Sequence, residues 1–134
     1  MRVLIDASAL NRAPSGTAVY VERLIPALEA AGVTVHTTRI RPRPRGGGGP
    51  RSYLNAALET GWTQAELPRR ARRAGVDLLH HPLPALARRS PVPQVVTVHD
   101  LAFEHLPECF DPRFRAVARR RHRAAARGAA AVVV

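Results

Sequence analysis

The chain has 134 residues, of which 46% are hydrophobic, and a formal net charge of +11 at pH 7. This size supports one hydrophobic core and not two, so we expect residues 1–134 to form one domain or part of one. No window approaches the roughly 20 apolar residues of a membrane span, and the start of the chain has no signal-peptide core. These features exclude a membrane-spanning protein and predict a soluble one.

The positive charge comes from one residue type, since all 21 basic residues are arginine. This bias is more typical of a GC-rich genome than of selection for one ligand. Arginine still favours weak, salt-sensitive contact with phosphates or an anionic membrane face. Aromatic side chains that could stack on bases are not interleaved with the arginines, so we expect no specific nucleic-acid binding.

Cys109 is the only cysteine in the chain. An internal disulfide is therefore excluded, and no metal-type cysteine spacing exists. We expect a reducing, cytoplasmic location and no bound metal.

The first predicted elements are a strand, a helix and a second strand. Residues 3–5 form the continuous apolar run of a buried parallel strand. A polar loop follows, and residues 17–32 then carry apolar side chains at helical spacing. Pro26 lies inside this helix and should bend its axis. Residues 33–40 read as the second strand, and 41–51 (RPRPRGGGGPR) as a mobile surface loop.

The middle of the chain alternates between helix and strand. Two short helices are predicted within 52–74, separated around Trp62, and strands are predicted over 76–80 and 94–98. Asp111 then supplies a helix cap, with a proline at the first helical position.

The helix that follows should end at Gly128, and AAAVVV predicts a final buried strand. Its apolar side chains are expected to share one face: Phe114, Val117, Ala118, Ala124 and Ala125. Strands alternating with helices predict an α/β fold with a doubly wound parallel sheet and right-handed crossovers. Because nothing follows the last strand to cover it, we expect these residues to be the front part of a larger protein.

Ligands of open parallel sheets bind beyond the carboxyl ends of the strands. The first strand leads to Gly16 and Thr17 at a helix start, where free N–H groups and the helix dipole favour an anion such as a phosphate. A tight turn is the competing explanation for Gly16. The chain has neither G-x-G-x-x-G nor a lysine-containing phosphate loop, which counts against NAD and ATP.

Two further predicted strands end in ionisable residues, the first in His80 and His81 and the second in His99 and Asp100. Each has a structural explanation: a histidine satisfied by a backbone carbonyl, and an aspartate that caps the next turn. Two histidine-bearing strand ends at one rim nevertheless indicate a candidate site.

Three stretches together resemble the amino-terminal half of a bacterial family 4 glycosyltransferase of the GT-B fold, in the mannosyltransferase-like group. They are RVLIDA with its glycine-containing loop, WTQAELPRRARRAGVDLLHHP over 62–82, and VVTVHDLAFEHLPECF over 95–110. The resemblance implies a Rossmann-like, acceptor-side domain whose donor-binding partner domain is missing from these residues. It implies retaining, metal-independent hexosyl transfer, without a cofactor, from a nucleotide diphosphate sugar to a glycan or lipid-linked acceptor.

The same resemblance implies roles for individual residues. Gly16 and Thr17 match the loop that approaches the donor diphosphate, and His99 matches a histidine that reaches the transferred sugar. Asp100 would orient His99 or its loop. Ala18 stands where many relatives have a second glycine, which weakens the phosphate role. We also consider three residues as acceptor contacts: His80, His81 and Tyr20.

Other hypotheses remain open at this point. The chain is expected to be inactive alone, and it could instead be a separate acceptor-binding subunit paired with a donor domain on another chain. The net charge of +11 also fits an arginine-rich module that binds nucleic acid or anionic lipid. A cytoplasmic protein of this kind could also bind the inner face of the membrane as a peripheral membrane protein.

Overall fold

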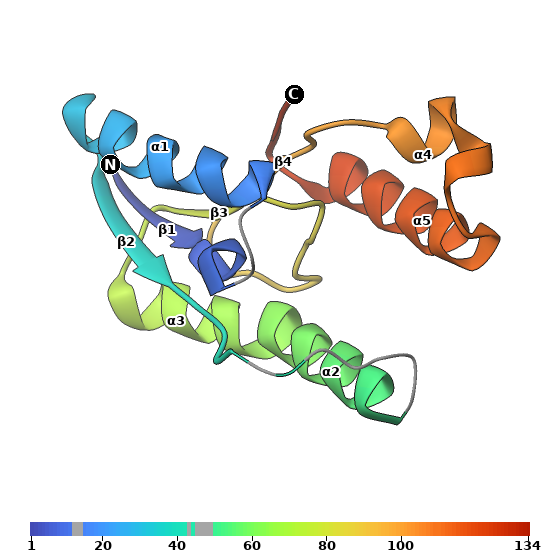
Figure 1. Ribbon diagram of the computed structural model, residues 1–134. Helices are drawn as coiled ribbons and strands as arrows, with labels where there is room; N and C mark the ends of the chain where they lie inside the picture. The colour runs from blue at the N-terminus through green and yellow to red at the C-terminus, as the bar shows by residue number, and fades with distance from the viewer. Residues whose placement is uncertain (12–14, 43, 45–49) are drawn as a thin grey trace.

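The computed structural model describes residues 1–11, 15–42, 44 and 50–134, and its centre is one parallel sheet (Figure 1). The spatial order is β2-β1-β3-β4-β5, with every neighbouring pair parallel. The strands are β1 (Arg2–Asp6), β2 (Thr34–Thr38), β3 (Leu78–His81), β4 (Gln94–Thr97) and β5 (Ala131–Val133). The predicted doubly wound α/β fold is confirmed, and the strand order reverses between β1 and β3.

The helices surround this sheet. They are η1 (Ala7–Asn11), α1 (Gly16–Ala30), α2 (Pro50–Gly61), η2 (Trp62–Glu66), α3 (Leu67–Ala74), α4 (Ala102–His105), η3 (Pro107–Cys109) and α5 (Pro112–Gly128). Helices α1 and α3 cover opposite faces of the sheet (Figure 1). Helix α1 continues through Pro26 without interruption. No helix in the described ranges has the length and apolar content that crossing a bilayer requires.

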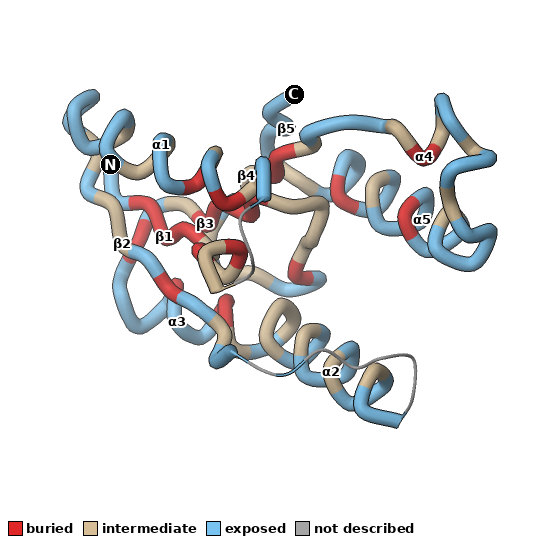
Figure 2. Tube along the Cα trace, in the orientation of Figure 1, coloured by how far each residue is buried: buried red, intermediate tan, exposed pale blue. Residues whose placement is uncertain are grey.

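Two apolar clusters hold the layers together. On the α3 face, Leu4 and Leu79 pack against Leu67 and Ala71. On the α1 face, Val21 packs with the alanines of η1. Val3, Leu4 and Ile5 are nearly inaccessible to water, as expected for a strand covered on both faces (Figure 2).

The segment 50–74 differs from the predicted pair of helices. It is one continuous helical run in which the π-helical turn η2 joins α2 to α3. Helix α2 begins at Pro50, so the end of the predicted loop 41–51 is helical. Residues 43 and 45–49 of that loop lie outside the described residues.

The predicted final strand forms, but the prediction that it is buried was wrong. All three residues of β5 are exposed, because nothing in the described structure covers this edge strand. In α5, Ala118 and Ala125 are buried, but Phe114 and Val117 are about half exposed. The helix therefore packs through a narrow stripe of alanines and not through its larger apolar side chains.

Candidate active site

All five strands point the same way, so their carboxyl ends share one edge of the sheet. The edge carries η1 and the start of α1 after β1, the loop from Pro82 after β3, and the segment around His99 after β4. Because the strand order reverses between β1 and β3, this edge is where an open α/β sheet binds its ligand. Most of the residues selected from the sequence lie here.

The start of α1 is capped, and its first N–H groups have no hydrogen-bond acceptor among the described residues. Ser15 is the N-cap, and its Oγ accepts a hydrogen bond from the Ala18 N–H at 3.2 Å. The N–H groups of Gly16 and Thr17 belong to the first turn, where an α-helix offers no internal acceptor. They can therefore donate to an anion.

Gly16 has no structural requirement to be glycine among the described residues. Its φ is not positive, and a Cβ built there meets no atom within 4 Å. The tight-turn explanation is therefore unsupported, and space for a ligand beside the backbone is available.

Tyr20 lies one helical turn after Gly16 and links α1 to two strands. Its hydroxyl is 3.1 Å from Oγ1 of Thr97 at the end of β4. The same Oγ1 is 2.9 Å from Nε2 of His80 at the end of β3. Tyr20, Thr97 and His80 thus form a hydrogen-bonded chain on the α1 face of the sheet.

His99 lies beside this chain and is exposed. Its ring meets the ring of Tyr20 edge to face, with centroids 5.0 Å apart and an interplanar angle of 83°. Its Nε2 donates to the backbone carbonyl of Pro82 at 2.9 Å, since a carbonyl can only accept. Two neighbours therefore fix the ring, and Nδ1 is the nitrogen left to meet a ligand.

Asp100 caps a turn in its own loop. Its Oδ1 accepts a hydrogen bond from the Ala102 N–H at 2.9 Å, at the start of α4. This is the turn-capping arrangement typical of aspartate. Within the described residues, the carboxylate makes no hydrogen bond to His99.

His80 and His81 point to opposite faces of the sheet because consecutive strand residues alternate. They are 5% and 1% exposed, so neither ring is open at the rim where the sequence placed it. Burial, with a smaller effect from the neighbouring His81, lowers the pKa of His80 to about 4. His80 is therefore neutral at pH 7.

His81 is part of a separate polar group under the other face. Its Nε2 donates to Oε1 of Gln94 at 3.0 Å, and its Nδ1 is buried without a partner among the described residues. Burial lowers the pKa of His81, although the Gln94 hydrogen bond and the Asp6 charge act in the opposite direction. Gln94 also bonds the backbone N–H and carbonyl of Ala87, both at 2.9 Å.

Sequence reasoning missed several polar residues at the same edge. Asp6, the last residue of β1, accepts hydrogen bonds from Trp62 Nε1 at 3.1 Å and from the Ser8 N–H at 3.1 Å. Gln64 in the π-helical turn bonds the Leu86 carbonyl and the Arg88 N–H at 2.8 and 2.9 Å. Asp6 and Thr97 could have been found by the criterion that selected His99, because both are polar residues at strand ends.

In the ranges that the structure describes, no three His, Cys, Asp or Glu side chains gather as ligands for a metal ion. The groups available to a ligand are instead hydrogen-bonding ones. They are the N–H groups that open α1 and the Nδ1 atom of His99, whose ring lies beside Tyr20. This set suits an uncharged polar group beside a phosphate.

The comparisons with known proteins give one family. The profile of Glycosyltransferase Family 4 matches residues 14–134, which is most of the chain. No curated protein and no solved structure matches the chain.

Proposed function

Because the chain belongs to glycosyltransferase family 4, we propose that it is the acceptor-side domain of a retaining hexosyltransferase. The donor is a nucleotide diphosphate sugar, and the acceptor is a glycan or lipid-linked sugar. One observation carries the proposal: His99 is exposed at the carboxyl edge and packs against Tyr20, one helical turn from the open start of α1. The groups proposed to bind the sugar and the phosphate are therefore linked through Tyr20.

The start of α1 would hold the donor diphosphate. The N–H groups of Gly16 and Thr17 are free of helical acceptors, and the positive end of the helix dipole lies there. Gly16 leaves room for an oxygen to approach the backbone. In this proposal the leaving diphosphate is stabilised by such donors and by a second, donor-binding domain, without a metal ion or organic cofactor.

His99 would contact the transferred sugar. The Pro82 carbonyl fixes Nε2, so Nδ1 is the atom that faces a sugar hydroxyl. Because Nε2 donates to that carbonyl, Nδ1 accepts a hydrogen bond from the sugar hydroxyl. In the reaction, the bond from the anomeric carbon to the diphosphate breaks and the acceptor oxygen bonds to that carbon. The acceptor proton leaves with the diphosphate.

The hydrogen-bonded chain of Tyr20, Thr97 and His80 would position these groups. Neutral His80 keeps Thr97 in place, and Thr97 fixes the Tyr20 hydroxyl. A role of Tyr20 in acceptor binding would use the ring edge near His99. Direct acceptor contact by His80 or His81 would require the acceptor to reach buried rings, so we assign both a supporting role.

The test is His99→Ala in the full-length enzyme, assayed with a panel of nucleoside diphosphate hexoses. We expect a fall in the transfer rate of about a hundredfold or more, as for loss of a hydrogen bond made in the transition state. His105→Ala, at an exposed histidine of α4, is the matched control and should retain the wild-type rate. A near-normal rate for His99→Ala would remove the proposed role.

A further inference from the structure

Helix α5 presents an unusual accumulation of positive charge. Its sequence, PRFRAVARRRHRAAARG, contains arginines and no acidic residue. In the described part of the chain, Arg119 alone among them forms a salt bridge, with Glu104 at 2.6 Å. Arg115 donates to the Phe103 carbonyl at 3.2 Å. The other arginines form no salt bridge there, although the charges of Arg115 and Arg123 also act on Glu104. Most of the positive charge on α5 is therefore left to attract an anionic surface.

The exposed side of α5 is ordered in rows. Residues seven apart lie nearly in line along a helix, so three adjacent rows can be traced. These rows, which we name the α5 surface, are Arg113–Arg120–Arg127, Val117–Ala124 and Phe114–Arg121. An apolar row thus lies between two rows that carry arginine.

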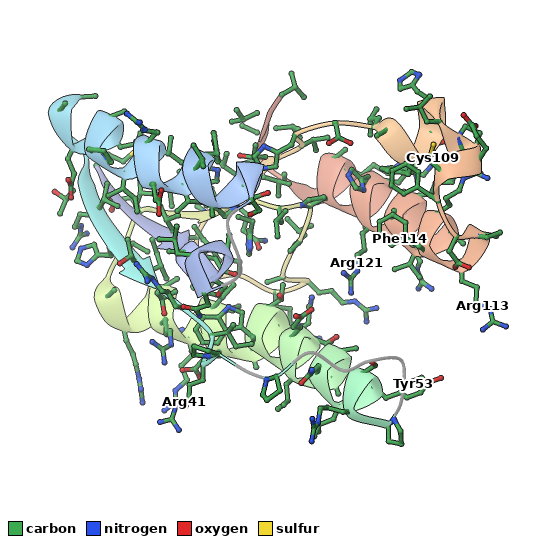
Figure 3. All side chains as sticks on the ribbon, viewed as in Figure 1. Arg41, Tyr53, Cys109, Arg113, Phe114 and Arg121 are labelled. Atoms are coloured by element: carbon green, nitrogen blue, oxygen red, sulfur yellow. The ribbon has the colours of Figure 1, made fainter. Side chains whose placement is uncertain are left out.

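The apolar part of the α5 surface is exposed to water. Phe114 and Val117 are 53% and 52% exposed. Phe110 extends the apolar area, since its ring stacks on Phe114 with centroids 5.7 Å apart. Figure 3 shows Arg113 and Arg121 extending from the lower side of α5 in that view. The buried alanines Ala118 and Ala125 follow Phe114 and Arg121 by four residues, so they adjoin that edge of the α5 surface. The Val117–Ala124 row and the Arg113 row lie further round the helix and are exposed, so docking through them leaves the alanine packing in place.

We propose that the α5 surface docks the protein onto an anionic phospholipid bilayer. A helix with arginine flanking an apolar row lies in the plane of a membrane interface, with its apolar side chains among the acyl chains and its cations among the headgroups. Arginine stems also bury their methylenes while the guanidinium groups stay with phosphate. The surface therefore complements both layers of the interface.

The exposed apolar row favours lipid over nucleic acid. A phosphate backbone would neutralise the arginines but leave Val117 and Ala124 in water. Single-strand binders stack successive bases on several aromatic side chains, whereas Phe114 is the one aromatic residue in the rows of the α5 surface. Membrane attachment is measured separately from sugar transfer, so either can hold without the other.

The experiment is co-sedimentation of the full protein with vesicles of phosphatidylglycerol and phosphatidylcholine, and with phosphatidylcholine alone. We expect binding to the anionic vesicles that weakens with salt, and little binding to the neutral ones. The triple variant Arg113→Gln, Arg120→Gln and Arg127→Gln should bind about a hundredfold more weakly. Each arginine near such a surface contributes about 1 kcal/mol, and about 1.4 kcal/mol is tenfold.

The matched control removes the same charge elsewhere, through Arg72→Gln, Arg73→Gln and Arg89→Gln, all at exposed positions. It should bind nearly as well as the wild type, and Phe114→Ser should weaken binding without any change in charge. Circular dichroism checks that each variant is folded. Equal losses in both triple variants, equal binding to neutral vesicles, or tighter binding to DNA or RNA than to anionic vesicles would each overturn the proposal.

Discussion

Acid should destabilise this protein because His80 is buried in its neutral form. The depth of that burial sets how much stability is lost. In the unfolded chain this imidazole takes up a proton near its ordinary pKa of 6.5, whereas burial lowers its pKa in the folded state to about 4. Between these values the unfolded state binds more protons, so stability rises with pH. The contribution of His80 to the free energy of unfolding is therefore complete above pH 6.5, and it is lost as the pH falls toward 4.

The full pKa difference corresponds to roughly 3 kcal/mol, and about 2 kcal/mol of it should be lost between pH 7.5 and pH 5. This is a large share of the about 5–15 kcal/mol by which domains are stable. His81 is also buried with a lowered pKa, so it should add to the loss in the same direction.

The assay is urea unfolding at both pH values for the wild type and His80→Gln. Glutamine keeps a polar group near Thr97 but does not titrate. We expect the variant to lose about 2 kcal/mol less than the wild type on acidification, while the exposed-site control His105→Gln follows the wild type. An identical pH dependence in His80→Gln and the wild type would refute the reasoning, because the ring would then not be buried as a neutral base.

Two further predictions concern backbone and packing. Gly75 ends α3 with φ +58°, so Gly75→Ala should lower the free energy of unfolding by about 1–2 kcal/mol. Gly61 has a helical φ of −59° and open space around it, so Gly61→Ala should raise the free energy of unfolding by up to about 1 kcal/mol. Urea unfolding measures both. Gln94→Ala leaves His81 Nε2 and two backbone groups of Ala87 without partners, so it should cost about 2–4 kcal/mol and speed hydrogen exchange at Ala87. Unchanged exchange would argue against the Gln94 contact.

The sequence was sufficient for the elements whose pattern is local. The apolar run of β1, the periodicity of α1 and the Asp111 cap of α5 depend on neighbours in the chain, so spacing alone predicted them. The alternation of strands and helices then required the parallel doubly wound sheet. The same logic placed His99 at the carboxyl edge, because every parallel strand ends there.

Tertiary structure decided which partner each of these side chains meets on the two faces of the sheet. His80 and His81 look equivalent in the sequence, but alternation along β3 sends one ring to Thr97 and Tyr20 and the other to Gln94. The exposure of Phe114, Val117 and β5 likewise depends on which surfaces find a partner in space, and no residue pattern contains that information. Contacts between residues far apart in the chain, such as that of Tyr20 with His99, therefore define the candidate site.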